Sequence, residues 1–109
     1  MNRQLYQGDI CIIEIPLKNI PKNLVFDKIP NSGIVCAEGE ITGHKHILEA
    51  TPEAKVEIAQ DEKGFYLKVN SGSAVLTHNK HAIQTIPQGI FFVGRQFEFD
   101  ELGERRVAD

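Results

Sequence analysis

Residues 55–69 read KVEIAQDEKGFYLKV, and this stretch decides the fold. Two sets of apolar residues each share one face under a period of two: Val56 with Ile58, and Phe65 with Leu67 and Val69. Such alternation is typical of β-strands. Between the two sets, residues 61–64 read DEKG and end in glycine, as hairpin loops built on a type I turn often do. The stretch therefore predicts a β-hairpin.

The rest of the chain repeats this pattern of short apolar runs separated by glycine, proline and asparagine. Further strands are predicted at residues 10–17, 34–37, 44–48, 74–77, 83–86 and 90–99. Turns are predicted at residues 30–33 (PNSG), 71–73 (SGS) and 87–89 (PQG). No window keeps helical spacing for three turns, so any helix is expected to be short. The pattern predicts an all-β fold, a small sandwich, jelly roll or barrel with little or no helix.

Length and composition predict a single β domain over residues 1–109, with residues 100–109 either a last edge strand or a frayed end. The chain is 41% hydrophobic and 25% charged, which is ordinary for a globular domain. Its formal net charge is −3 and no basic stripe is present, so nucleic acid is not an expected partner. The N-terminus has no apolar core, and no apolar run is long enough to span a bilayer.

Two cysteines, Cys11 and Cys36, each lie inside an apolar run. Buried thiols in such runs commonly act as small hydrophobic side chains, and free thiols fit a reducing compartment better than an oxidising one. Together with the absence of a secretory or membrane segment, the cysteines lead us to expect a cytoplasmic domain.

All four histidines fall in two short segments, residues 44–46 (HKH) and 78–81 (HNKH). Residues two apart on a strand point the same way, so His44 and His46 are expected to present both rings on one face. If residues 79 and 80 form the two-residue loop of a hairpin, His78 and His81 become cross-strand neighbours on one face. If that segment is a straight strand instead, their rings point to opposite faces.

Neutral imidazole is the commonest protein ligand for transition metals, and three such ligands with an open position characterise catalytic sites. We therefore expect a divalent transition metal, Zn, Fe, Mn or Ni. The expected ligands are His44, His46 and one or both of His78 and His81, with Glu49 in reserve. Glu40 also flanks the first pair. An open metal position would polarise a small oxygen-bearing ligand or activate water, but the sequence assigns no reaction and no catalytic residue.

Three other interpretations of the sequence stay open. The histidines are also compatible with plain surface or hydrogen-bonding roles near turns, and with a patch that responds to pH because protonated rings repel one another. The third is a module without enzymatic activity that binds a protein partner or a second copy of itself. The apolar runs at residues 10–15 and 90–99 motivate it, since such strands can extend a neighbouring sheet.

One set of short segments extends over nearly the whole chain: QGD at 7–9, AEGE at 37–40, TGHKH at 42–46, LTH at 76–78 with His81, RQFEF at 95–99 and RVAD at 106–109. Together they resemble a family of small bacterial proteins that is uncharacterised, which implies a single domain and no activity. Gly39, His44, His46 and Glu49 follow the order of the first cupin motif, with Glu49 closer to His46 than in that motif. The similarity to cupins implies a double-stranded β-fold with a histidine-bound metal.

Overall fold

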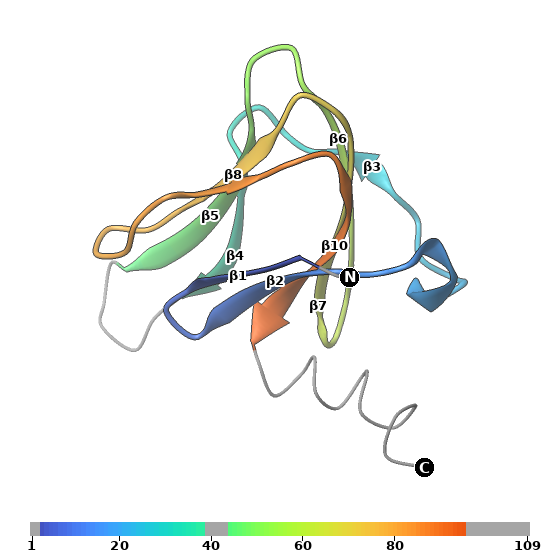
Figure 1. The fold of residues 1–109 in the computed structure, drawn as a ribbon, viewed down its shortest axis with the longest axis horizontal. Helices are drawn as coiled ribbons and strands as arrows, with labels where there is room; N and C mark the ends of the chain where they lie inside the picture. Colours follow the sequence, from blue (N-terminus) through green and yellow to red (C-terminus); the bar gives the residue numbers. More distant parts are fainter. Residues whose placement is uncertain (1–2, 39–43, 96–109) are drawn as a thin grey trace.

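The computed structural model describes residues 3–38 and 44–95. Glu40, the predicted strand residues 96–99 and the tail at 100–109 lie outside these residues. Within the described residues the chain forms two antiparallel sheets (Figure 1). The larger sheet runs, in spatial order, β1 (Gln4–Gln7), β2 (Ile10–Glu14), β10 (Gly89–Arg95), β7 (Gly64–Ser71), β6 (Lys55–Asp61) and β3 (Asp27–Lys28). The smaller sheet runs β4 (Ile34–Glu38), β5 (Lys45–Ala50), β8 (Ala74–Thr77) and β9 (Gln84–Ile86).

The chain crosses from one sheet to the other in the connections β3–β4, β5–β6, β7–β8 and β9–β10. The β6–β7 hairpin lies in the large sheet, while β5 and β8, which precede and follow it, pair in the small sheet. In the same way β3 pairs with β6 and β4 with β5, while β7 pairs with β10 and β8 with β9. The result is a small two-sheet sandwich, which confirms the predicted all-β class.

The main core fills the space between the two sheets. It contains Ile10, Ile12, Val56, Ile58, Phe65, Leu67, Val69, Phe91 and Val93 from the large sheet, Leu48, Ala74, Leu76 and Ile86 from the small sheet, and Ile29. The apolar faces predicted around residues 55–69 and at Phe91 and Val93 all point into this core. Burial of apolar area is the main force that holds the sheets together.

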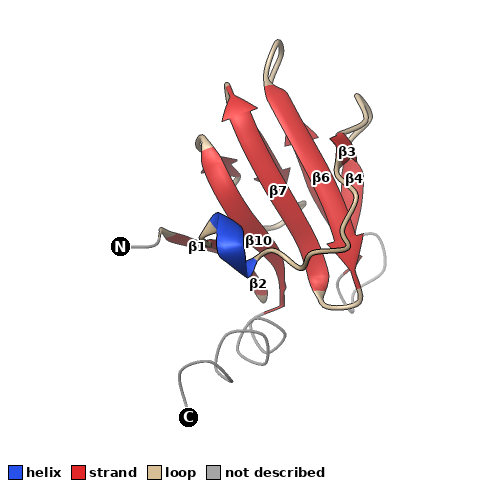
Figure 2. Ribbon diagram, turned by 90° about the vertical axis from the view of Figure 1, so that its right-hand side faces the viewer, coloured by secondary structure: helices blue, strands red, loops and turns tan. Residues whose placement is uncertain are grey.

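A second apolar cluster covers the outer face of the large sheet. Cys11, Ile13, Ile15, Tyr66 and Phe92 form it, and the segment that follows β2 packs over them with Ile20, Leu24 and Phe26. Figure 2 shows this segment, with its 3₁₀ turn η1 (Leu17–Asn19), crossing in front of the sheet. Because both faces of the sheet are covered, β2 and β10 are continuous apolar runs rather than alternating ones.

The hairpin at residues 55–69 forms as predicted, with Asp61 opposite Gly64. The side-chain oxygen Oδ1 of Asp61 accepts hydrogen bonds from the backbone amides of Lys63 and Gly64, which fixes the turn. The sequence pattern did not predict β1 or the two-residue strand β3. The predicted strand at 10–17 ends earlier, at Glu14. Within residues 3–38 and 44–95, no helix is long and apolar enough to cross a membrane.

Candidate functional site

The histidines come from the start of β5 and from the loop between β8 and β9. His46 lies on β5 and is buried, with 2% of its surface exposed, while His44 directly precedes this strand. Neither of the two alternatives for this segment, a two-residue hairpin loop at residues 79 and 80 or a straight strand, is formed. Because β8 ends at Thr77 and β9 begins at Gln84, His78 and His81 both lie in a longer loop, residues 78–83.

The longer loop still brings the two pairs of rings together. The ring centre of His78 lies 4.3 Å from that of His46, 4.6 Å from that of His81 and 5.6 Å from that of His44. The rings of His46 and His81 are nearly parallel, with centres 6.2 Å apart. His44 and His46 therefore both face His78, as expected for residues two apart on an extended chain. In Figure 1 the start of β5 and the β8–β9 loop lie at the same end of the molecule.

The turn between β1 and β2 reaches the same end of the sandwich. Gln7 pairs with Ile10, so Gly8 and Asp9 form a two-residue loop. Gly8 has a φ of +61°, which matches the glycine that type II′ hairpins carry at the first loop position. A side-chain Cβ at Gly8 would lie only 2.8 Å from Nε2 of His81. Glycine is therefore needed both for the turn and for the close approach of the ring.

Asp9 adds a carboxylate to the histidines. Its Oδ1 lies 3.8 Å from Nε2 of His46, and its Oδ2 lies 3.4 Å from Nε of Arg95. Neither Asp9 nor Gln7 was predicted as a site residue. The signal that would have found them is the Gly-Asp pair after Gln7, because such a pair between two extended runs is typical of a tight hairpin that projects its side chains.

Gln7 ties the β1–β2 turn to the histidines. It is 2% exposed, and its Oε1 lies 2.9 Å from Nδ1 of His46. Its side-chain nitrogen donates to the carbonyl oxygens of Leu76, at 2.8 Å, and Ala82, at 2.9 Å. The side chain thus connects β1, β5, the end of β8 and the β8–β9 loop.

The surroundings favour the uncharged form of two of the rings, those of His46 and His78. Burial lowers the pKa of His46, the neighbouring charge of His78 lowers it further, and Asp9 opposes the shift. Desolvation also lowers the pKa of His78, followed by the charges of His81 and His44. Neutral imidazole has a free nitrogen lone pair, so these rings are in the form that metals bind.

In this structure the side chains at the histidine end do not surround a common point. Within residues 3–38 and 44–95, no group of three or more His, Cys, Asp or Glu side chains is arranged to hold a metal ion. Nδ1 of His78 accepts a hydrogen bond from the backbone amide of Lys80 at 2.9 Å, so the neutral ring carries its proton on Nε2.

Glu49, the predicted reserve ligand, is not brought to the rings. It lies three residues after His46 on β5, at an odd spacing, while Leu48 continues the buried face of that strand. The side chain of Glu49 lies beside Gly33. The carboxylate near the rings is that of Asp9.

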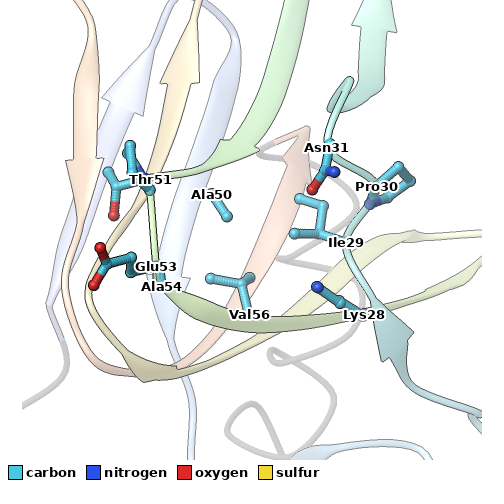
Figure 3. A pocket seen from close by; sticks show the side chains of 10 residues that line it. Lys28, Ile29, Pro30, Asn31, Ala50, Thr51, Glu53, Ala54 and Val56 are labelled. Atoms are coloured by element: carbon cyan, nitrogen blue, oxygen red, sulfur yellow. The ribbon is translucent and has the colours of Figure 1, made fainter.

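A separate hollow of about 260 Å³ lies at the far end of β5, between the turns that follow β3 and β5 (Figure 3). Its floor includes Ile29 and Val56, and Lys28, Asn31 and Glu53 lie on its rim. These three polar side chains are exposed, and within the described residues no side-chain hydrogen bond orients them. The histidine end, with two buried and hydrogen-bonded polar side chains, is the stronger candidate site.

The model of one protein family, described as "Domain of unknown function (DUF8820)", matches residues 6–96. No curated protein and no solved structure matches the chain. The expected resemblance to an uncharacterised domain family is thereby confirmed, whereas the cupin resemblance receives no support. The matched range includes the β1–β2 turn and all four histidines.

Proposed function

The chain belongs to the DUF8820 family, and we propose that this domain binds one divalent transition metal ion, Zn, Fe, Mn or Ni, at the histidine end of the sandwich. The observation that carries the proposal is the spacing of four imidazole rings that come from two separate segments of the chain. No reaction is assigned to the site.

The ring spacing fits a shared ion. An imidazole bound to zinc has its ring centre about 3.2 Å from the ion, so two such rings in tetrahedral geometry have centres roughly 5.2 Å apart. The observed separations of 4.3, 4.6, 5.6 and 6.2 Å lie on both sides of this value. These four separations are therefore close to those of rings that share one ion, although the rings would have to turn before their nitrogens could bind it.

Asp9 supports the proposal as an oxygen ligand. Two ligand atoms on one tetrahedral zinc ion are separated by roughly 3.4 Å. The 3.8 Å between Oδ1 of Asp9 and Nε2 of His46 is too long for a hydrogen bond but close to that separation. The carboxylate would also offset part of the charge of the ion, and zinc, iron and manganese all accept oxygen ligands.

Burial decides which ligands are fixed and which must move. His46 is buried and hydrogen-bonded to Gln7, so it would act as the fixed ligand. His44 and His78 are half-buried and His81 is exposed, so their rings have room to turn. His78 would have to give up its hydrogen bond from Lys80 before its Nε2 could bind. We therefore propose His46 as the fixed ligand, with His44, one or both of His78 and His81, and Asp9 as the ligands that turn toward the ion.

The proposal is tested by metal titration of untagged full-length protein, first stripped of metal. Zn²⁺ and Co²⁺ are expected to bind with 1:1 stoichiometry and to raise the melting temperature, because a ligand that binds only the folded state stabilises it. The replacement His46→Ala should abolish this shift, and His44→Ala should weaken it. Glu49→Gln is the matched control, since Glu49 points away from the rings. A chain without stoichiometric binding, or binding that survives His46→Ala, would contradict the proposal.

If the ion keeps an open position, a small oxygen-bearing ligand is the proposed occupant. Assembly through residues 10–15 and 90–99 stays the alternative proposal, although within the described residues β2 and β10 are buried and paired on both sides. A cytoplasmic location remains a proposal, supported by two free cysteines. The cupin resemblance also stays a prediction, and the metal proposal does not depend on it.

A further inference from the structure

The orientation of the Gln7 amide is determined by its hydrogen bonds. An amide has one acceptor oxygen and an NH₂ group with two donor hydrogens. The nitrogen of Gln7 is directed at two backbone carbonyl oxygens, those of Leu76 and Ala82, which can only accept. Turning the amide over would place its oxygen against both of them, inside a site that water hardly reaches. Oε1 must therefore be the atom that faces His46.

The orientation of Gln7 in turn decides where His46 carries its proton. An amide oxygen only accepts hydrogen bonds, so Nδ1 of His46, 2.9 Å away, has to be the donor. In a neutral imidazole the other nitrogen then carries the lone pair. That nitrogen is Nε2, the atom that faces Asp9 at 3.8 Å. Free histidine in water favours the opposite tautomer, with the proton on Nε2.

From this chain of hydrogen bonds we propose that Gln7 is a positioning residue, which holds His46 in the Nδ1–H tautomer and so presents the Nε2 lone pair to a metal ion. The proposal that Gln7 serves a metal ligand rests on the proposed function, whereas the tautomer of His46 does not. In other metalloproteins, carbonyl or carboxylate groups orient metal-binding histidines by accepting a hydrogen bond from the second ring nitrogen, and Gln7 would act in the same way. Removing such a partner lowers metal affinity about 10- to 100-fold.

Two further features fit this role. Gln7 is on β1 in the large sheet, whereas His46 is on β5 in the small sheet, so the hydrogen bond spans the two layers. The same amide holds the carbonyl of Ala82, in the loop that carries His78 and His81. One side chain therefore sets the tautomer of the buried ring and anchors the loop with the exposed rings.

The test begins with the metal-free wild-type protein and needs no variant. Long-range ¹H–¹⁵N correlation spectra of protein labelled with ¹⁵N-histidine, recorded at about pH 8 where imidazole is neutral, distinguish the two tautomers. The expected spectrum for His46 shows a protonated Nδ1 and a bare Nε2. The opposite tautomer would overturn the proposal, whether or not the protein binds metal.

The variants then separate positioning from structural support. Gln7→Met removes the acceptor and is expected to lower Zn²⁺ affinity about 10- to 100-fold, with the Nε2–H tautomer of His46 appearing in the spectra. Gln7→Glu keeps an acceptor for Nδ1–H and should retain the tautomer, whereas its second oxygen would face the carbonyl oxygens of Leu76 and Ala82 and should lower the stability of the folded state. Gln60→Met, an exposed glutamine on β6, is the control for the loss of a glutamine. Unchanged affinity in folded Gln7→Met would overturn the role.

These experiments distinguish failure of the metal-binding proposal from failure of the proposed role of Gln7. If His46 shows the Nδ1–H tautomer but no ion binds, the metal function is wrong and the hydrogen-bond chain of Gln7 stands. If Zn²⁺ binds while His46 shows the Nε2–H tautomer, the metal function stands and the positioning role of Gln7 is wrong.

Discussion

Replacement of Gly8 by alanine tests the geometry of the β1–β2 turn and of the histidine end together. Gly8 has a φ of +61°, a backbone conformation that costs other residues about 1–3 kcal/mol. A Cβ at this position would lie 2.8 Å from Nε2 of His81. Since comfortable contacts between such atoms begin at about 3.5 Å, the ring would have to move by roughly 0.7 Å.

The two effects of Gly8→Ala act on different properties. His81 is exposed and its ring is the far end of a flexible side chain, so it moves away at a cost of about 1 kcal/mol or less. Backbone strain then dominates the loss of stability, about 1–3 kcal/mol, which for a domain of this size lowers the melting temperature by roughly 5–20 °C. Displacement of the ring dominates the loss of Zn²⁺ affinity, about 10-fold.

A double-mutant cycle of Gly8→Ala and His81→Ala separates the two, with urea unfolding for stability and Zn²⁺ titration for affinity. The stability losses should be nearly additive. The affinity losses should not, because without the His81 ring there is nothing to displace. Gly72→Ala is the matched control: Gly72 has a φ of +72° and a Cβ there would lie 2.6 Å from Ala54, at the other end of the sandwich. It should lower stability and spare affinity.

Two results would refute this reasoning. A stability loss below about 0.5 kcal/mol for Gly8→Ala would mean that the turn does not need a left-handed residue. An equal loss of Zn²⁺ affinity for Gly8→Ala with and without the His81 ring would mean that the turn and the ring do not contact each other.

Three further predictions concern the scaffold. Hydrogen bonds from Arg3 lower the pKa of Glu14 to about 2. The pair therefore contributes fully to the free energy of unfolding above about pH 4.5, and this contribution is lost as the pH falls toward 2. Glu14→Gln should flatten the pH dependence of urea unfolding in that window, and an unaltered profile would count against the prediction. Burial raises the pKa of the Cys36 thiol to about 12, so a thiol reagent at about pH 8 should modify it only in urea, and rapid modification of the folded protein would disagree. Asp61→Ala removes the acceptor of the turn amides and of the Tyr66 hydroxyl and should cost about 1–3 kcal/mol, whereas an unchanged urea midpoint would show that the turn does not need the carboxylate.

The sequence predicted the fold wherever the pattern is local. The hairpin around Asp61 and Gly64 and the strand at 74–77 are set by alternation and turn residues that are neighbours in the chain. By contrast β1 carries mostly polar residues, and β3 has only two, both exposed. Both strands exist because a partner strand is present, β2 for β1 and β6 for β3, and a local pattern does not contain that partner.

Of the residues at the candidate site, only the histidines could be predicted from the sequence. The histidines stand out because they are rare and grouped, and the same-face argument held for His44 and His46. Gln7 and Asp9 are ordinary surface residues by type, and they reach the site because the β1–β2 turn meets the small sheet. The hydrogen bonds of Gln7 join residues 39, 69 and 75 positions apart, a separation at which periodicity carries no information.

Stability alone does not account for the buried pair of Gln7 and His46. Each polar atom of the pair has to be desolvated, and the hydrogen bonds that compensate it are worth only about 0.5–1.5 kcal/mol net each. Two apolar side chains of similar shape would fill the same space between the sheets about as well. What an apolar pair lacks is direction: it has no lone pair to offer a metal ion beside Asp9 and no donor to hold the carbonyl of Ala82. The chemistry that the pair adds is the orientation of one imidazole nitrogen, which is why a ligand-binding role explains it better than a structural one.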